Sequence, residues 1–183
     1  MAIKLGIVMD PISSINIKKD TSFAMLLQAQ ERDYEIYYME MADLYIENGR
    51  SYSKMKQLTV QNKSTNWYTF GEQYDWPLAE LDVILMRKDP PFDTEYIYAT
   101  YMLEKAESEG TLIVNKPQSL RDANEKLFTS WFPQCCPTTL VTRDPQRLRA
   151  FHQEQKDVIL KPLDGMGGAS IFRLKEDDAN VGV

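Results

Sequence analysis

Apolar runs and amphipathic stretches alternate along the first part of the chain. Residues 3–9 are almost continuously apolar, which is typical of a strand buried on both faces of a sheet. Asp20 or Thr21 can then cap a helix whose apolar residues recur three and four positions apart. Residues 34–40, YEIYYME, form a second strand-like run. The order strand, helix, strand predicts a βαβ unit and a parallel sheet.

The pattern changes between residues 42 and 70. An Asn48-Gly49 pair lies between two alternating segments, which is the strongest short-range signal for a β-hairpin. Residues 66–70, NWYTF, are a candidate for a further strand. We therefore expect a hairpin inserted into the parallel sheet.

The buried-strand pattern returns after this insertion. Residues 81–87 (LDVILMR) and 111–115 (TLIVN) read as two more core strands. Between them, Asp93 or Thr94 can cap a helix that ends at Gly110. Residues 1–122 thus read as an α/β domain with an open parallel sheet.

A separate α+β pattern occupies residues 123–183, so we place a domain boundary near Asp122. The Asp122-x-x-Glu125 spacing resembles a capping box and predicts a helix start there. The elements predicted after it are a strand at 138–142, a helix at 144–155, a strand at 157–160, a glycine loop and a strand at 170–174.

Composition and charge exclude several functions. The formal net charge is −6, whereas general nucleic-acid and membrane-surface binders need a cationic field. No apolar run approaches the ~20 residues that span a bilayer, and the first residues lack a signal-peptide pattern. Cys135 and Cys136 are adjacent, so neither a disulfide loop nor a metal site is expected. Two free thiols and no export signal indicate a cytoplasmic protein.

The glycine cluster at residues 165–168 is the strongest chemical signal. Its spacing matches neither the Walker A loop nor the dinucleotide fingerprint, and the alternating residues after it predict a strand, not a helix. A flexible loop between two strands remains, whose amides can close over phosphates. A plain turn is the alternative. Lys161 favours the phosphate interpretation, because it ends a strand that we expect to be buried, where a charge needs a partner.

Four stretches carry a family resemblance: KLGIVMDPI, LMRKDPPFDTEYIYAT, GTLIVNKPQSLRDANEKL and ILKPLDGMGGASIFR. With them the chain resembles the ATP-grasp superfamily and, within it, the prokaryotic-type glutathione synthetases. The resemblance implies a pre-ATP-grasp N-terminal domain followed by part of an ATP-grasp lid domain. It also implies ATP-dependent ligation of γ-glutamylcysteine and glycine through an acylphosphate, with Mg²⁺, in a homo-oligomer. No nucleic-acid or membrane partner is expected.

The resemblance also implies roles for individual residues. Lys126, Lys161 and the loop glycines Gly165, Gly167 and Gly168 match the family's ATP-phosphate site, and Met166 would be an apolar contact within the loop. Taken alone, without the resemblance, Lys126 reads as a solvated helix charge.

A substrate site is expected at the carboxyl edge of the first sheet. By resemblance, Arg87 holds a carboxylate of the dipeptide, which suits a bidentate guanidinium. The alternative is an arginine paired with Asp89 or Asp93. Ser13 and Asn16 lie in the loop after the first strand and could shape the same site.

The family's adenine, acylphosphate and Mg²⁺ residues are expected beyond the glycine loop, outside this sequence. We therefore expect no catalytic residue and no metal ligand within residues 1–183, and a fragment that does not turn over by itself. Two alternatives stay open: a non-catalytic module of the same fold, and an ATP-grasp ligase with another acid or amine. His152, on a polar helix, is expected at the surface.

Overall fold

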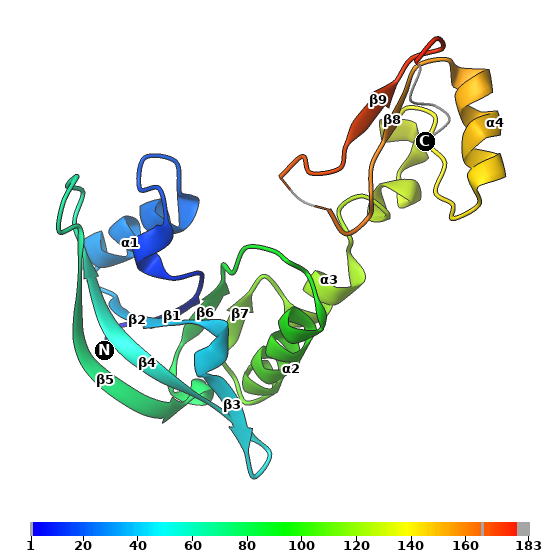
Figure 1. The fold of residues 1–183 in the computed structure, drawn as a ribbon. Helices are drawn as coiled ribbons and strands as arrows, with labels where there is room; N and C mark the ends of the chain where they lie inside the picture. Colours follow the sequence, from blue (N-terminus) through cyan, green and yellow to red (C-terminus); the bar gives the residue numbers. More distant parts are fainter. Residues whose placement is uncertain (1, 166, 179–183) are drawn as a thin grey trace. The chain divides into compact units, whose positions relative to one another are not determined.

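The computed structural model describes residues 2–165 and 167–178. The chain divides into two compact units, unit 1 (Met1–Asp122) and unit 2 (Ala123–Val183). Figure 1 shows the elements of each unit, which are described separately below.

Unit 1 is built on a sheet that has seven strands within the described residues. Four strands are parallel, in the order β2-β1-β6-β7. Their bounds are β1 (Lys4–Val8), β2 (Glu35–Met39), β6 (Val83–Met86) and β7 (Leu112–Val114). Ile7 of β1 pairs with Tyr38 of β2 on one side and with Leu85 of β6 on the other. The predicted parallel sheet is confirmed.

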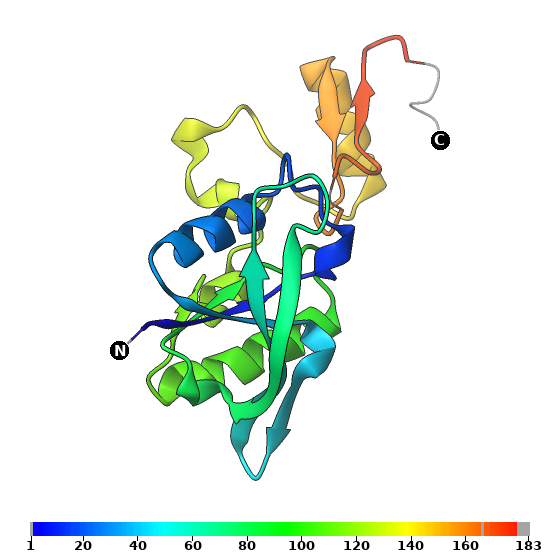
Figure 2. The same ribbon diagram turned by 90° about the vertical axis from the view of Figure 1, so that its left-hand side faces the viewer.

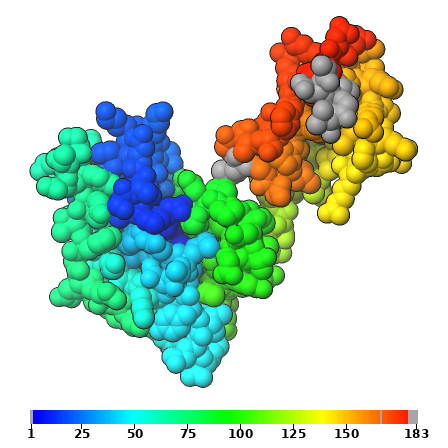
Figure 3. Space-filling model, viewed as in Figure 1, coloured from blue at the N-terminus to red at the C-terminus, as the bar shows by residue number. Residues whose placement is uncertain are grey.

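The inserted hairpin is also confirmed. β3 (Leu44–Glu47) and β4 (Arg50–Val60) are antiparallel, and the turn between them places Asn48 and Gly49 at φ 47° and 78°. Asparagine and glycine tolerate these left-handed conformations best. β5 (Tyr68–Pro77) pairs with the other edge of β4. The turn between β3 and β4 protrudes from the surface of unit 1 (Figure 3).

Two helices cover opposite faces of this sheet (Figures 1 and 2). α1 (Thr21–Glu31) packs Phe23 and Leu26 into one apolar cluster, and α2 (Thr94–Ser108) packs Leu103 into the other. The side chains of Asp20 and Asp93 cap the two helices by accepting hydrogen bonds from amides in their first turns. The shorter helical elements are η1 (Ile12–Ser14), η2 (Met41–Asp43), η3 (Leu78–Glu80) and α3 (Pro117–Asp122).

Unit 2 is smaller and more open. It contains η4 (Phe128–Trp131), η5 (Pro133–Cys135), α4 (Pro145–Gln155) and an antiparallel pair, β8 (Val158–Leu160) and β9 (Phe172–Leu174). Among its described residues only His152 is buried, at 7 % exposure, and its Nε2 lies 3.1 Å from the Lys175 carbonyl. The expectation of a surface histidine was therefore wrong.

Two predicted elements of unit 2 do not form. No helix starts at Asp122, because α3 ends there and Asn124 turns the chain by accepting hydrogen bonds from the amides of Lys126 and Leu127. Residues 138–142 form no strand. In the described part of unit 2, β8 and β9 are the only strands, and they pair with each other. No helix among the described residues is long and apolar enough to cross a bilayer.

Candidate functional site

A polar pocket of about 230 Å³ lies in unit 1 where parallel strands end. β1 and β6 lead into it, at the carboxyl edge where open α/β sheets bind ligands. It is lined by Met9, Asp10, Ile15, Lys19, Asp20, Thr21, Ser22, Arg87 and Asp89.

Arg87 joins the end of β6 to the start of α1. Its amide donates to the Val8 carbonyl at 2.7 Å. Its guanidinium donates to Ser22 Oγ at 3.0 Å through Nε and to Thr21 Oγ1 at 2.9 Å through Nη2. No ion pair between Arg87 and a carboxylate occurs in the described residues, so the alternative pairing with Asp89 or Asp93 is not formed. Neutral hydroxyls therefore orient the guanidinium, and no carboxylate of the described residues forms an ion pair with it.

Asp10 fixes the loop that follows Arg87. One carboxylate oxygen lies 2.9 Å from the Lys88 ammonium, and the other accepts a hydrogen bond of 2.9 Å from the Asp89 amide. This ties residues 88–89 to the end of β1. The backbone on the C-terminal side of Arg87 is therefore fixed, while its guanidinium is held by Ser22 and Thr21.

Ser13 and Asn16 do not line this pocket. Both are exposed, and the Asn16 carbonyl accepts from the amides of Lys19 and Asp20, each at 2.9 Å. Asn16 thus shapes the loop that carries two pocket residues. Direct contact of Ser13 or Asn16 with a ligand stays a prediction.

The sequence reading missed a role for residues 19–22 (KDTS) beyond helix capping. In the structure this segment supplies an ammonium, a carboxylate and two hydroxyls to the pocket. The available signal was a cation and two hydroxyls around the cap of the first helix, which follows the first parallel strand along the chain. In the sequence alone such a cluster is typical of a solvated loop, because its position at the edge of the sheet is set only by the fold.

The glycine loop of unit 2 joins β8 to β9, so its predicted strand–loop–strand setting is confirmed. Gly167 and Gly168 have φ of 66° and 81°, which side-chain-bearing residues rarely adopt. Gly165 is required for space, because a Cβ there would lie 2.7 Å from Pro162 Cγ. Met166 lies outside the described residues.

Lys126 reaches this loop from the segment before η4. Its ammonium donates to the carbonyls of Leu163, at 3.2 Å, and Gly165, and it pairs with Glu125 at 3.0 Å. This pairing holds the pKa of the Glu125 carboxyl below its usual value. The structure therefore brings Lys126 and the glycine loop together, with the ammonium lying against two backbone carbonyls.

Lys161 is exposed, and the described residues include no hydrogen-bond or ion-pair partner for its ammonium. The strand that it ends is open to solvent, with Ile159 at 51 % and Leu160 at 39 % exposure. The expectation that β8 is buried was wrong, because in the described part of unit 2 it has one neighbouring strand. Within the described part of the chain, Lys161 is thus an unpaired cation four positions before Gly165, the first glycine of the loop.

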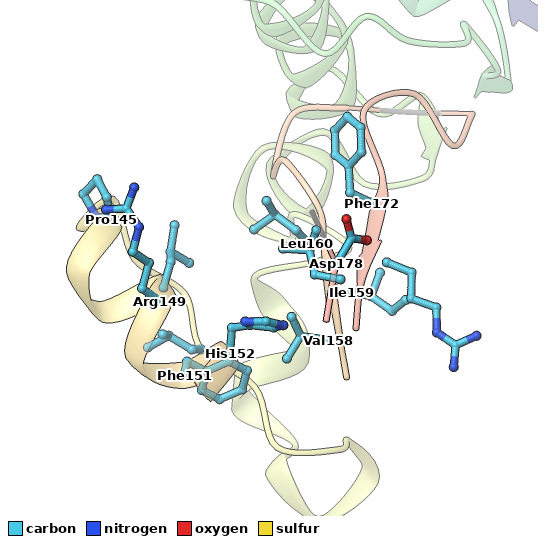
Figure 4. A pocket seen from close by; sticks show the side chains of 13 residues that line it. Pro145, Arg149, Phe151, His152, Val158, Ile159, Leu160, Phe172 and Asp178 are labelled. Carbon is cyan, nitrogen blue, oxygen red and sulfur yellow. The ribbon is translucent and has the colours of Figure 1, made fainter. Parts of the chain in front are cut away.

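A larger cavity in unit 2, about 750 Å³, separates α4 from the β8–β9 hairpin (Figure 4). Its lining is mostly apolar and includes Leu148, Phe151 and Ile159. None of the predicted site residues lines it.

The described residues contain no group of three or more His, Cys, Asp or Glu side chains placed to hold a metal ion. The residues present in this part of the chain do not make a Mg²⁺ site by themselves.

Comparison with models of known families shows the family of the chain. The profile described as "Prokaryotic glutathione synthetase, N-terminal domain" matches residues 3–121, and "Prokaryotic glutathione synthetase, ATP-grasp domain" matches residues 125–183. The chain belongs to the prokaryotic glutathione synthetase family. The resemblance stated from the four sequence stretches is confirmed.

Curated relatives named glutathione synthetase are similar over nearly the whole chain. Those from Shewanella oneidensis and Photorhabdus laumondii are each 70 % identical over 181 residues, which is 99 % of this chain. The chain spans 58 % and 57 % of their respective lengths. It therefore corresponds to a little more than half of each relative.

Solved structures support the ATP-grasp fold. The ATP-grasp ligase PsnB, in complex with its minimal precursor, aligns with a TM-score of 0.55 and 17 % identity, covering 99 % of this chain and 59 % of PsnB. D-alanyl-alanine synthetase A from Vibrio cholerae aligns with a TM-score of 0.52 and 12 % identity, covering 96 % of this chain and 53 % of that enzyme. At these identities the likeness shows the fold, and the predicted fold class is confirmed.

Proposed function

We propose that this chain is the substrate-binding and phosphate-binding part of a glutathione synthetase. The whole enzyme would join γ-glutamylcysteine to glycine at the expense of ATP, through an acylphosphate. The observation that carries the proposal is 70 % identity, over 99 % of the chain, to relatives of that name.

The chemistry requires activation of a carboxylate. A carboxylate is a poor acyl donor, because its leaving group would be oxide, and phosphorylation supplies a better one. Transfer of the phosphoryl group depends on positioning and on neutralisation of charge. Both tasks suit residues that hold the reactants without reacting themselves.

The ATP phosphates would be bound by unit 2. Lys126 and Lys161 supply positive charge, and the backbone of Gly165, Gly167 and Gly168 supplies a loop that closes over the anion. Two of these glycines already hold left-handed conformations, and the third leaves no room for a side chain. Closure of this loop would shield the acylphosphate from water.

The dipeptide would be bound by unit 1. Arg87 is held by two hydroxyl groups and keeps its charge available, so a substrate carboxylate can pair with it. Ser13 and Asn16, in the preceding loop, would border the ligand.

Mg²⁺ would assist by neutralising phosphate charge, and PsnB has been solved with Mg and ADP. The described residues provide no cluster of metal ligands, so those ligands would come from elsewhere in the whole enzyme. The chain alone would then bind substrates without turnover. The alternative, a module of the same fold whose own role is only binding or oligomerisation, predicts no ligase in any context.

A chimera tests the proposal. The chain is joined to the remaining C-terminal part of the Shewanella oneidensis relative, and ADP release is measured with ATP, Mg²⁺, γ-glutamylcysteine and glycine. We expect turnover that requires both γ-glutamylcysteine and glycine, and none from the chain alone. Lys126→Ala and Lys161→Ala should each lower the rate at least tenfold, about 1.4 kcal/mol.

The exposed Lys54, on β4 of unit 1, is the matched control, and Lys54→Ala should leave the rate unchanged. Turnover that needs a different acid or amine would contradict the glutathione assignment. A folded chimera that releases no ADP with any acid would favour the binding module.

A further inference from the structure

The side-chain amide of Asn124 links the segment that carries Lys126 to the base of the glycine loop. Its Oδ1 accepts hydrogen bonds from the backbone amides of Lys126 and Leu127, at 3.0 and 2.9 Å. Its Nδ2 donates to the Leu163 carbonyl at 3.1 Å, across 39 positions of sequence. One short side chain thus fixes a local turn with one end and holds a distant part of the chain with the other.

This set of contacts requires a carboxamide. Its oxygen accepts and its nitrogen donates, whereas an ionised carboxylate has no donor. A serine hydroxyl at position 124 could still accept from the amides that follow it. Its donor and its acceptors lie on one atom close to the backbone, so it could not also hold Leu163. The bond to Leu163 therefore depends on asparagine, and the local turn does not.

The Lys126 ammonium reaches the same part of the loop, and its donors are fully engaged there. An ammonium group has three N–H donors. In the structure they lie against Glu125 Oε1 at 3.0 Å, the Leu163 carbonyl at 3.2 Å and the Gly165 carbonyl. A phosphate oxygen can therefore bind this ammonium only by replacing at least one of these three partners.

The Leu163 carbonyl accepts from both Asn124 and Lys126. A carbonyl oxygen has two lone pairs, so the two donors can share it. The two contacts respond differently to a phosphate, because a charged donor is attracted to an anion far more strongly than a neutral amide is. A phosphate that draws the ammonium away would leave the Asn124 amide on the carbonyl.

The backbone around Leu163 is suited to being held at one point. Pro162 has a fixed φ. A Cβ at Gly165 would lie 2.7 Å from Pro162 Cγ and 3.3 Å from the Ala169 carbonyl oxygen, so the two ends of the glycine loop lie close together. A bond to the Leu163 carbonyl therefore fixes the point from which the loop starts.

We propose that Asn124 is a positioning residue that anchors the base of the glycine loop while Lys126 exchanges a carbonyl contact for a phosphate of ATP. The inference rests on the proposed function, in which Lys126 and the loop bind the ATP phosphates. Asn124 itself does not contact the phosphate. It keeps the Leu163 carbonyl paired, so that the loop does not have to be ordered again at the expense of binding free energy.

NMR relaxation of the nucleotide-free chain tests the anchor. Order parameters are measured for the amides of residues 163–165 and 167–170 in the wild type, Asn124→Ser, Lys126→Ala and the double variant. Each single variant keeps one donor on the Leu163 carbonyl, so the order parameters at 163–165 should stay near those of the wild type. The double variant loses both donors, and these values should fall toward the roughly 0.6 that marks a flexible backbone.

Titration calorimetry with a non-hydrolysable ATP analogue and Mg²⁺ tests the consequence for binding. Asn124→Ser should weaken binding about threefold to tenfold, the factor that one net hydrogen bond supplies, because Lys126 cannot serve the carbonyl and the phosphate together. Serine satisfies a local turn about as well as asparagine, so a role confined to the turn predicts wild-type affinity. Gln134→Ser, at an exposed amide of η5 in the same unit, is the matched control and should change nothing.

The outcomes separate this inference from the proposed function. Wild-type affinity in Asn124→Ser would overturn the inference, as would a loop base that is as flexible in Lys126→Ala as in the double variant. Unchanged affinity in Lys126→Ala, or no binding of the analogue to the folded chain, would instead contradict the proposed phosphate site. The order parameters of the nucleotide-free chain would still decide whether Asn124 holds the loop.

Discussion

Unit 1 and unit 2 differ in what their apolar side chains contact. In unit 1, Ile7, Leu26 and Leu103 are fully buried, and two apolar clusters cover the two faces of one sheet. In unit 2, Trp131 is 64 % exposed and Phe172 57 % exposed. The polar pocket in unit 1 thus lies on a rigid frame, whereas the glycine loop in unit 2 is carried by a two-stranded hairpin. A site that fixes a substrate head needs the first kind of support, and a loop that closes over phosphates can use the second.

The largest effect that separates the units should come from truncating buried side chains. Leu103→Ala removes a fully buried side chain between α2 and the sheet, and we expect a loss of about 2–5 kcal/mol in the free energy of unfolding. The matched change in unit 2, Leu160→Ala, affects a side chain that is 39 % exposed and should cost about 1 kcal/mol or less. A urea titration in which unfolding is detected by peptide-resolved hydrogen exchange measures the free energy of unfolding of each unit separately. Equal losses would contradict the difference in packing.

A smaller effect should distinguish two glycines of similar conformation. Gly168, with φ of 81°, lies in the loop of unit 2, and Gly49, with φ of 78°, lies in the hairpin turn of unit 1. Alanine at either position should cost about 1–2 kcal/mol of backbone strain.

Only Gly168→Ala should also weaken binding of a non-hydrolysable ATP analogue, by about fivefold or more, since about 1 kcal/mol corresponds to that factor. Calorimetry on both variants measures this. Equal weakening by Gly49→Ala would show that the effect does not depend on the loop.

The smallest effect concerns the ion pair of the hairpin. Arg173 donates to both carboxylate oxygens of Asp157, at 2.9 and 2.6 Å, and lowers the pKa of that carboxyl. A lowered pKa stabilises the hairpin while the carboxylate is charged, and this contribution is lost as the pH falls below the ordinary value of about 3.9 and through the lowered pKa.

An NMR pH titration of the amides in β8 and β9 should show this loss in the wild type and not in Asp157→Asn. Asp177→Asn, an exposed carboxylate outside the pair, should titrate like the wild type. A hairpin that opens at the same pH in all three proteins would exclude the ion pair as the cause.

Sequence patterns predicted unit 1 well because its elements satisfy local and tertiary demands together. The apolar run at 3–9 became β1, the Asn48-Gly49 pair became the hairpin turn, and Asp20 and Asp93 cap the helices. Unit 2 was predicted less well. Residues 138–142 read as a strand, yet strand formation needs a pairing partner that the described residues do not supply.

The candidate sites show the same division between local and distant information. The glycine spacing and flanking residues predicted a loop between strands, which is a local property. The polar pocket depends on Arg87 meeting residues 19–22 across 65 positions of sequence, and no local pattern contains that contact. Only the parallel register of β1 and β6 brings the two segments to one edge.

Residue-resolved ligand mapping by NMR tests most directly whether the two units hold different parts of the substrate set. The backbone amides of the chain are followed during separate titrations with γ-glutamylcysteine and with a non-hydrolysable ATP analogue. We predict that the dipeptide shifts amides at 19–22 and 87–89 in unit 1, and that the nucleotide shifts amides at 126 and 161–170 in unit 2. Nucleotide shifts confined to the unit 1 pocket, or dipeptide shifts confined to the glycine loop, would contradict the account.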